Sequence, residues 1–323
     1  MSRYELFDRS KLAVKSLDER DSKSDLSIML DKAPEVSKEE YDLVKPVADE
    51  FVKAKNANAP IIIAYGAHLF KNGCSPMLIN LMRKGYVQQL LTNGAGVIHD
   101  FEMSMAGKTE EDVRRYVSEG QFGLWEETGR YINEAIVTGA AQDKGLGEAV
   151  GELISTGSVG KLSLEFPNRK YSIVGSAYEL NVPLSACVGI GHDIIHTHPA
   201  CDGAALGKTS YTDFLIFANT VSRLQHGVMA SVGSAIMAPM VFEKSLSMAK
   251  NLARTENRQL DDYSIFVNDI QPGTWDWAKG DPPKNNPAYF LRFCKSFSRM
   301  GGRFSYICMD NRKFLGTLES MLA

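Results

Sequence analysis

The chain has 323 residues, and its 36 Lys and Arg nearly balance its 39 Asp and Glu, for a formal net charge of −3. This balance, without a basic block, argues against non-specific binding of nucleic acid or of an anionic membrane surface. The five cysteines are an odd number and form no CxxC pair, which predicts reduced thiols in a cytoplasmic compartment. No apolar signal region opens the chain and no apolar run is long enough to span a membrane, so we expect a soluble, cytoplasmic protein.

The first 57 residues are expected to form an N-terminal arm and helix. Residues 1–37 are charged and contain no long periodic apolar segment, which predicts a partly ordered arm that covers a neighbouring subunit. Ser37 opens the sequence S-K-E-E, a capping box that predicts a helix of about 18 residues ending near Lys55. Residues 58–323 are then expected to form a single domain.

From residue 58 onward, strand-length apolar segments alternate with helix-length amphipathic segments. We expect strands at residues 60–65, 87–91, 182–190, 227–232, 263–267 and 304–309. We expect helices at residues 75–84, 124–137, 146–154, 209–221, 241–254, 287–299 and 311–322. This order predicts an α/β fold with a Rossmann-like, doubly wound and mostly parallel sheet.

Residues 182–190 form the segment on which the functional prediction depends. They form an apolar run, and Gly189 and Gly191 permit a sharp turn at its end. His192 and Asp193 are the first ionisable groups beyond that turn. Because ligands of open α/β sheets bind beyond the carboxyl ends of the strands, we expect an active site here.

Two earlier strand ends also run into Gly-containing turns, at Gly66 and at Gly94. Such turns bring backbone N–H groups close to phosphate or ribose. No GxGxxG sequence follows the first strand, and residues 203–209 lack the spacing of a P-loop, so a nucleotide would bind in another manner. The helix after the second strand is expected to open at Ile98, which places Asp100 in its first turn, where the helix dipole favours an anion.

The spacing of His192, His196 and His198 can present imidazoles to a metal, with Asp193 or Asp202 as an oxygen ligand. A metal site needs groups that converge from fixed elements, and the glycine-rich segment that follows does not supply them. A metal hydrolase is therefore the weaker interpretation, and we predict no metal.

Two features near the C-terminus point to an amine ligand. Trp275 and Asp276 combine an aromatic ring with a carboxylate, which suits an elongated cation, although packing of the tryptophans on the core is an equal alternative. Lys295 lies among apolar residues, where desolvation lowers the pKa of an ammonium group toward that of a nucleophilic amine. A lysine that extends along the surface is the alternative.

Four segments of the predicted domain match, in order, the motifs of a known family. The sequences TNGAGVIHD at 92–100, GIGHDII at 189–195 and VNDIQ at 267–271 lie at expected strand ends, and Lys295 lies eight residues after Pro287. Together these segments resemble the deoxyhypusine synthase family. The corresponding motifs of that family are T-A-G-G-x-x-E-D, D-G-S-L-G-D-M-I, I-N-T-A-Q and P-x-E-A-x-S-W-G-K.

The resemblance implies NAD bound at a subunit interface of a homotetramer. It also implies a transferase that moves an aminoalkyl group from a polyamine-type donor to an amine acceptor through a lysine imine, with Lys295 as the covalent nucleophile. From the resemblance and the strand ends together we assign as catalytic Lys295, His192, Asp193 and His99. The predicted substrate-binding residues are Trp275, Asp276, Tyr289 and Phe293. The predicted cofactor-binding residues are Gly66, Ala67, His68, Thr92, Asn93, Gly94, Asp100, Asn268, Asp269, Asp310 and Asn311.

Several positions depart from that family. His99 replaces the glutamate of its E-D pair, Phe293 its tryptophan and Tyr289 a second glutamate. These departures favour a protein that acts on a different amine or guanidine, with His192 or His99 as the general base. Two alternatives also retain NAD. One is a deaminase or cyclodeaminase of a small amino acid such as ornithine, which needs no covalent lysine, and the other is a non-catalytic NAD-binding paralogue.

Overall fold

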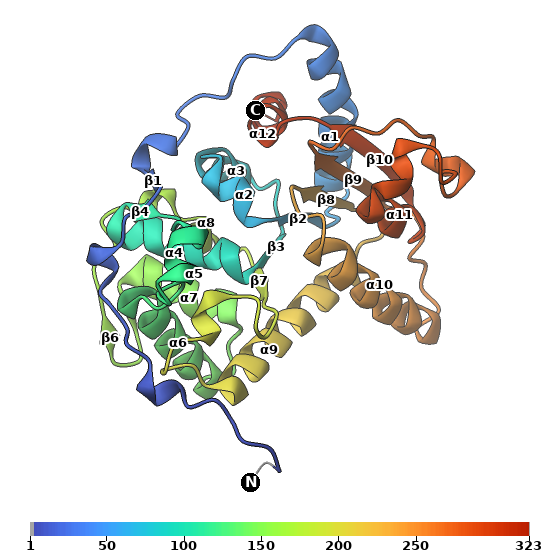
Figure 1. The fold of residues 1–323 in the computed structure, drawn as a ribbon. Coiled ribbons are helices and arrows are strands. Elements are labelled where there is room, and N and C mark those ends of the chain that lie inside the picture. Colours follow the sequence, from blue (N-terminus) through green and yellow to red (C-terminus); the bar gives the residue numbers. More distant parts are fainter. Residues whose placement is uncertain (1–2, 323) are drawn as a thin grey trace.

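A six-stranded parallel β-sheet forms the centre of the computed structural model, which describes residues 3–322 (Figure 1). The strands of this sheet are β2 (Ile61–Tyr65), β3 (Gln89–Asn93), β7 (Leu184–Cys187), β8 (Val228–Val232), β9 (Ser264–Asp269) and β10 (Arg303–Cys308). They lie in the order β10-β9-β8-β2-β3-β7, so the chain builds three strands toward one edge and then returns to build three toward the other. This is the strand order of doubly wound dinucleotide-binding folds, and it confirms the predicted α/β, Rossmann-like class.

The central strand β2 packs against different helices on its two faces, because side chains alternate along a strand. Ile61, Ile63 and Tyr65 belong to one buried cluster, and Ile62 and Ala64 belong to the other. All five residues are fully buried, as expected where helices cover both faces of a parallel sheet.

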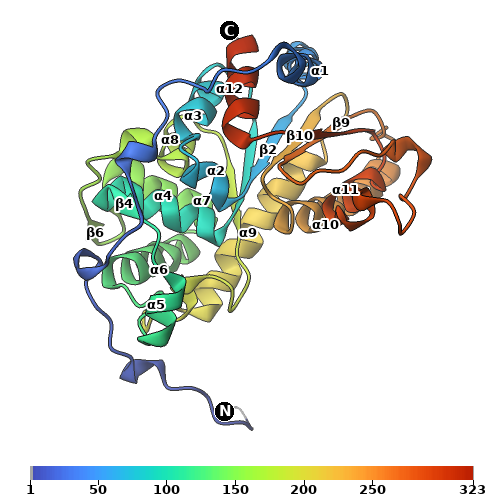
Figure 2. The ribbon, with the colours of Figure 1, turned by 45° about the horizontal axis from the view of Figure 1, so that its top comes forward.

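The helices form a layer on each face of the sheet. Within residues 3–322 they are α1 (Lys38–Asn56), α2 (Ala67–Lys71), α3 (Ser75–Arg83), α4 (Gly94–Ala106), α5 (Val113–Ser118), α6 (Glu126–Ala141), α7 (Leu146–Thr156), α8 (Ile173–Glu179), α9 (Gly203–Val221), α10 (Met237–Thr255), α11 (Arg292–Ser298) and α12 (Asn311–Met321). One layer contains α1, α3 and α12, and the other contains α9, α10 and α11 (Figure 2). None of these helices has the length and apolar character needed to cross a membrane.

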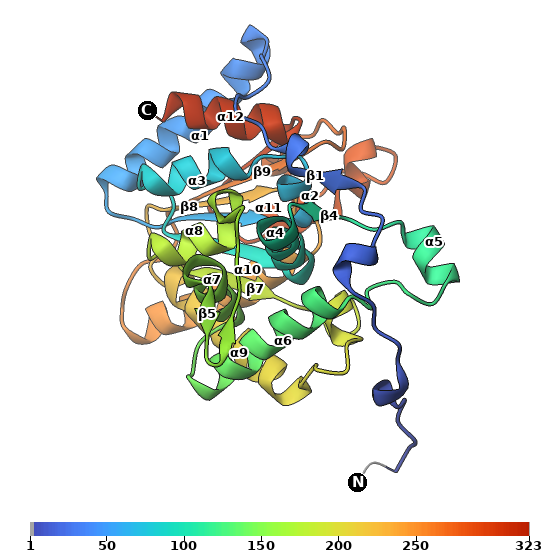
Figure 3. The ribbon, with the colours of Figure 1, turned by 90° about the vertical axis from the view of Figure 1, so that its left-hand side faces the viewer.

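The N-terminal arm packs on its own chain, across α4, α5 and α6 (Figure 3). Its strand β1 (Ser24–Asp25) pairs antiparallel with β4 (Lys108–Thr109). Leu17 is buried in a small cluster with Tyr116 and Trp125. These contacts place the arm on its own chain, and its contact with a neighbouring subunit stays a prediction. A second short antiparallel pair, β5 (Ser158–Val159) and β6 (Leu162–Ser163), follows α7.

The predicted start of α1 is confirmed in atomic detail. Ser37 Oγ accepts a hydrogen bond from Glu40 N at 3.2 Å, and Glu40 Oε2 accepts one from Ser37 N at 2.9 Å. By contrast, the strand expected at residues 182–190 is too long by two residues at its start and three at its end. It ends at Cys187, which pairs with the last residue of β3, Asn93, so the chain beyond it has no neighbouring strand and turns into a loop.

Several helix boundaries also differ from expectation, among them the start of α10 at Met237 rather than at residue 241 and the end of α6 at Ala141 rather than at residue 137. α4 begins at Gly94 rather than at Ile98, because Asn93 supplies the cap. α9 begins at Gly203 rather than at residue 209, because Asp202 caps it. The helix expected at residues 287–299 is divided into a 3-10 turn and α11 by the non-helical backbone of Leu291.

Candidate active site

The carboxyl ends of β2 and β8 meet where the strand order reverses. A Cβ atom on Gly66 would lie 2.5 Å from the carbonyl oxygen of Gly233, so the close approach of these two backbones requires glycine. Gly233 has a φ of 60°, in the left-handed region that also favours glycine. In folds with this strand order, dinucleotides bind in the crevice at this point. The first feature of the site is therefore a close backbone approach at the point where a dinucleotide is expected.

Two predicted cofactor residues, Asn268 and Asn311, fix the neighbouring strand ends. Asn268 Nδ2 donates to Met309 O at 3.1 Å and to Asn311 Oδ1 at 2.9 Å, while Asn268 O accepts from Gly233 N at 3.0 Å. The side-chain oxygen Asn268 Oδ1 is buried and has no hydrogen-bond partner within the described residues. An unpaired buried acceptor is rare in proteins, and here it lies beside the crevice where a polar ligand is expected.

Other predicted cofactor residues stabilise the turn between β3 and α4. Thr92 Oγ1 donates to Tyr65 O at 3.1 Å, and Asn93 Oδ1 accepts from Gly96 N at 2.9 Å. These side chains therefore join two strand ends and cap a helix. Ala67 and Gly94 are buried, whereas the accessible or half-buried members of the predicted set are His68, Asn93, Asp269 and Asp310.

Asp100 does not lie in a first helical turn, because α4 begins six residues earlier at Gly94, and its assignment to the cofactor site stays a prediction. It is fully buried in the middle of α4. Its carboxylate accepts hydrogen bonds from Ile173 N at 2.7 Å, from Val174 N at 3.1 Å and from Ser172 Oγ. Asp100 thus satisfies the amino end of α8 instead. Burial raises its pKa to about 7, although these hydrogen bonds oppose the shift.

A cavity of about 220 Å³ lies at the carboxyl ends of β3 and β7, beside the first turns of α4. The predicted catalytic residues His99, His192 and Asp193 all line it, so the structure brings together residues from two distant segments. Sequence reasoning missed its other ionisable lining residues, because no local motif marks them. These are Arg20, Lys71, Glu102, Glu110 and Glu111.

A larger cavity, of about 550 Å³, lies near the amino end of β7, between α7, α8 and α9. It is lined by Glu148, Glu179 and Asp213 among others. Ligands of doubly wound sheets bind at the carboxyl ends of the strands, so the smaller cavity is the better candidate despite its size.

Asp193 lies directly over the amino end of α4. A Cβ atom on Gly94 would lie 2.4 Å from Asp193 Cγ, so only a glycine leaves room for the carboxylate there. Asp193 Oδ2 accepts from Gly189 N at 3.2 Å. Burial raises the pKa of Asp193, and these backbone hydrogen bonds oppose the shift only in part. The amino end of a helix favours an anion, which explains the position of the carboxylate.

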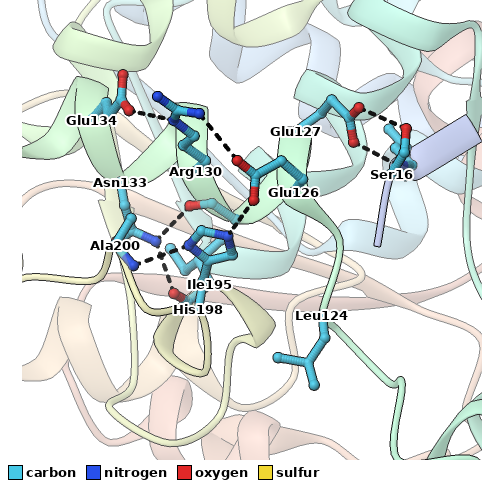
Figure 4. A network of polar contacts seen from close by, with 12 residues as sticks. Ser16, Leu124, Glu126, Glu127, Arg130, Asn133, Glu134, Ile195, His198 and Ala200 are labelled. Carbon is cyan, nitrogen blue, oxygen red and sulfur yellow. Dashed lines mark hydrogen bonds and ion pairs between the residues drawn. The ribbon is translucent and has the colours of Figure 1, made fainter. Parts of the chain in front are cut away.

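The loop that carries Asp193 is anchored to α6 (Figure 4). Asn133 Nδ2 donates to Ile195 O at 2.9 Å. His198 Nδ1 accepts from Ala200 N at 3.1 Å, so its proton resides on Nε2, which lies 3.3 Å from Glu126 Oε2. Figure 4 shows His198 turned toward Glu126 of α6.

This arrangement separates the three histidines that could have formed a metal site. His198 is committed to Glu126, and His196 Nδ1 accepts from Gly191 N at 3.3 Å. Within residues 3–322, no group of three or more His, Cys, Asp or Glu side chains is placed to hold a metal ion. The HxxxHxH spacing therefore reflects loop anchoring.

A buried ion pair supports one wall of the cavity. Arg20 from the N-terminal arm donates to both carboxylate oxygens of Glu102 at 2.7 Å, and each side chain is 1% exposed. Thr109 Oγ1 and Thr128 Oγ1 also donate to Glu102, at 2.6 and 2.7 Å. His99 Nδ1 lies 2.8 Å from Thr109 Oγ1. Burial lowers the pKa of His99 to about 4, although the Glu102 carboxylate opposes this.

Lys295 lies at the other end of the sheet, on α11 beside β10. Its ammonium group lies 3.4 Å from Asp281 Oδ2 and 4.2 Å from the centre of the Tyr289 ring. Phe293 is buried against Tyr306. None of these residues lines the cavity that contains His99 and Asp193.

The tryptophan loop also lies at that end. Trp277 is buried and packs edge-on against Phe304. This arrangement matches the alternative in which the tryptophans of the loop pack on the core. Trp275 Nε1 donates to Gly280 O at 2.8 Å, and Asp276 is exposed and accepts from Ala278 N at 3.2 Å. The predicted catalytic and substrate residues thus fall into two groups at opposite ends of the sheet.

The fold and the crevice define a doubly wound, Rossmann-type protein. Residues 45–146 match the family model described as arginine dihydrolase ArgZ-like, C-terminal, Rossmann fold. A curated relative, the bifunctional arginine dihydrolase/ornithine cyclodeaminase AgrE of Nostoc sp., is 34% identical over 77 residues. This match covers 24% of the present chain and 11% of that protein.

Solved structures share the fold. Unliganded AgrE superposes with a TM-score of 0.54 at 16% identity, over 89% of this chain and 33% of that chain. The ternary complex of AgrE with ornithine and NAD⁺ gives a TM-score of 0.52 at 15% identity, over 89% of this chain and 34% of that chain. The present chain therefore spans about a third of the AgrE chain.

These matches overturn the transferase interpretation. The matched family model and the curated relative are arginine dihydrolase and ornithine cyclodeaminase proteins, not transferases of alkyl or aminoalkyl groups. A deoxyhypusine synthase-like structure from Entamoeba histolytica is only distantly similar, with a TM-score of 0.42 at 11% identity. The prediction of a deoxyhypusine-synthase-like polyamine transferase is wrong. Glycine-rich turns at the carboxyl ends of parallel strands follow from the shared fold and do not specify the reaction.

Proposed function

We propose that this chain is an NAD-dependent cyclodeaminase of a small basic amino acid of the ornithine class. The observation that carries the proposal is the cavity at the carboxyl ends of β3 and β7, which presents carboxylates, histidines and a lysine together. The segment that matches the ArgZ-like Rossmann model, residues 45–146, supplies Lys71, His99 and Glu102 to this cavity. In support, AgrE is named as an ornithine cyclodeaminase and has been solved with ornithine and NAD⁺.

The residues beside the crevice fit a dinucleotide. Gly66 and Gly233 bring the backbones of two strand ends close together without side chains between them, and Asn268 contributes an unpaired acceptor. The half-buried carboxylates of Asp269 and Asp310 stand at the ends of β9 and β10, where ribose hydroxyls find acceptors. When bound, NAD supplies a hydride acceptor beside the substrate.

The charges of the cavity suit an amino acid with a second ammonium group. Lys71, whose ammonium group lies 3.5 Å from Glu110, would pair with the substrate carboxylate. Asp193 and Glu110 would pair with its ammonium groups. The volume of about 220 Å³ is below the roughly 300–1,000 Å³ of sites for drug-sized ligands, and it suits a small amino acid.

Proton transfer in this cavity falls to His99 and Asp193. An ammonium nitrogen must lose a proton before it can form a C=N bond, so the substrate needs a base. His99 is neutral at pH 7, because its pKa is lowered to about 4, and one of its ring nitrogens therefore has no proton. Asp193, whose pKa is raised by burial, is a second group in the cavity that could take part in proton transfer.

Product analysis tests the proposal. The purified protein is first shown to bind NAD by calorimetric titration and is then incubated with NAD and ornithine, arginine, lysine or putrescine. We expect ornithine to yield proline and ammonia in equal amounts, with no net consumption of NAD. Protein that binds NAD but forms no product from any of these compounds would contradict the proposal and favour a non-catalytic NAD-binding protein.

A further inference from the structure

Glu102 is held as a buried carboxylate that only accepts hydrogen bonds. Burial is the largest influence on its pKa and raises it, but the hydrogen bonds and charge of Arg20, together with His99 and Thr109, outweigh burial, and the net effect is a lowered pKa. Its four hydrogen bonds come from two Arg20 nitrogens and from the hydroxyls of Thr109 and Thr128. An ionised carboxylate has no proton to donate, so each threonine hydroxyl must be the hydrogen-bond donor to Glu102.

Thr109 can then only accept a hydrogen bond from His99. A threonine hydroxyl has one proton, and the proton of Thr109 is directed at Glu102 Oε2 at 2.6 Å. Thr109 Oγ1 also lies 2.8 Å from His99 Nδ1. A ring nitrogen without a proton would place two lone pairs against each other at this distance. His99 Nδ1 therefore carries the proton and donates it to Thr109.

The opposite ring nitrogen of His99 is then a free base. A neutral imidazole has a single N–H, so Nε2 keeps its lone pair. No group within the described residues hydrogen-bonds to Nε2, and His99 lines the cavity. The charged and titratable groups around the ring are Arg20, Lys71, Glu102, Glu110, His192 and Asp193.

We propose that Thr109 is a positioning residue that fixes the tautomer of His99, so that His99 Nε2 takes a proton from the substrate ammonium group. This inference rests on the proposed function for the identity of the substrate. The substrate N–H bond breaks as a bond from that proton to Nε2 forms, which leaves a neutral amine and an imidazolium ring. The imidazolium keeps its Nδ1–H bond to Thr109, and Glu102 behind it offsets the new positive charge. The same proton leaves later with the departing ammonia.

The chain of hydrogen bonds from Arg20 through Glu102 and Thr109 to His99 also gives the N-terminal arm a role in the site. Arg20 is the cation that keeps Glu102 ionised, and it belongs to the arm rather than to the sheet domain. Serine at position 109 would keep the hydroxyl, whereas valine would keep the shape of threonine without any acceptor. The pair T109S and T109V therefore isolates the hydrogen bond from the packing.

Nitrogen-15 NMR of the histidine rings tests the tautomer without requiring turnover. The protein is labelled at histidine, and the His99 signals are assigned by their loss in H99N. We expect the Nδ1–H tautomer at neutral pH in the native protein and in T109S, and a shift toward the Nε2–H tautomer in T109V. The Nε2–H tautomer in the native protein would overturn the inference, and that result does not depend on whether T109V folds.

Activity supplies the second arm of the test. We expect kcat for ornithine to fall about 10–100-fold in T109V and to stay near the native value in T109S, since this is the usual effect of removing a group that orients a catalytic residue. NAD affinity should be unchanged in both. If the tautomer is as expected but no protein turns over ornithine, the proposed substrate fails while the geometry stands. Equal activity of T109V and native protein would overturn the positioning role.

Discussion

The two ends of the carboxyl edge of the sheet hold their charges in different ways. At the β3–β7 end, the Arg20–Glu102 pair is 1% exposed on each side and carries two further hydrogen bonds. At the β9–β10 end, the pair between Lys295 and Asp281 is 19% and 36% exposed. The first pair has been removed from water, whereas the second remains partly solvated.

This difference supports the proposed location of the active site at the β3–β7 end. Burying a charge is unfavourable unless partners satisfy it fully, so buried networks that line a cavity are candidates for functional sites. Partly exposed ion pairs contribute little to stability and arise readily on any surface. Lys295 had the sequence context of a nucleophile, yet its surroundings are those of an ordinary surface ion pair and a stacked tyrosine.

The largest expected effect is on turnover and contrasts His99 with Lys295. Removing a general base typically lowers the rate by about 10²–10⁴-fold, so we expect H99N to lose that much kcat with ornithine. K295A should keep kcat close to the native value, because no step needs a covalent lysine. Steady-state kinetics on both variants, after NAD binding has been verified, checks this. Loss of activity in K295A alone would reverse the comparison.

The second prediction compares the stabilities of the two ion pairs. R20M leaves Glu102 buried without its cation, so we expect a loss of about 3–5 kcal/mol in the free energy of unfolding. K295M breaks a partly exposed pair and should change it by at most about 1 kcal/mol. Urea unfolding followed by circular dichroism measures both. Similar losses in the two variants would show that burial does not separate the two ends.

The third prediction concerns pH and buried carboxylates near β7. Burial raises the pKa of Asp213 from 3.8 to about 7, which its hydrogen bonds from Ala186 N and Gly147 N only partly offset. The folded state therefore binds this proton more tightly than the unfolded state. Its contribution to stability is present in full below about pH 4 and is lost as the pH rises through 7.

D213N removes this titration, so its stability relative to the native protein should rise between pH 4 and pH 7 by on the order of 2–4 kcal/mol and stay level above. Asp281 gives the opposite sign, because the Arg299 guanidinium lowers its pKa, and its contribution is lost only at acid pH. Unfolding measured across this pH range decides the sign. A stability difference between D213N and the native protein that does not depend on pH would show that Asp213 stays ionised.

The fourth and smallest prediction tests the crevice between the two ends. A Cβ atom on Gly66 meets the Gly233 backbone, so G66A should destabilise the protein by about 1–3 kcal/mol and weaken NAD binding. Gly207 on α9 has open space around a Cβ, and G207A should stabilise by up to about 1 kcal/mol. Thermal unfolding and NAD titration of the two variants compare them. Unchanged NAD affinity in G66A would remove the crevice from the cofactor site.

The sheet was predictable because its signal is local. The run from Ile61 to Tyr65 is apolar over a strand length, and such runs alternate with amphipathic helices throughout the domain. The rule that carboxyl ends of parallel strands share one edge also brought His99 and Asp193 into the same predicted site. The strand order was not predictable from local patterns. The start of α4 at Gly94 was missed as well, because Asn93 and the two glycines that follow are typical of a turn as much as of a helix cap.

The supporting side chains of the cavity lay outside any sequence pattern. Arg20 reaches Glu102 only because the arm folds back over α4, and nothing local marks either residue as a partner of the other. Lys295 misled for a related reason. Its spacing from Pro287 matched the deoxyhypusine synthase motif, and residues 287–299 were expected to form one helix. The backbone of Leu291 divides that helix, and α11 packs against β10 at the far end of the sheet.

The measurement that tests the central claim most directly is a crystal structure of the protein with NAD and ornithine bound. We predict ornithine in the cavity between the ends of β3 and β7, with an ammonium group within hydrogen-bond distance of His99 Nε2 and its carboxylate near Lys71. Ornithine bound beside Lys295 and Asp276, or in the larger cavity at the amino end of β7, would contradict the assignment of the active site.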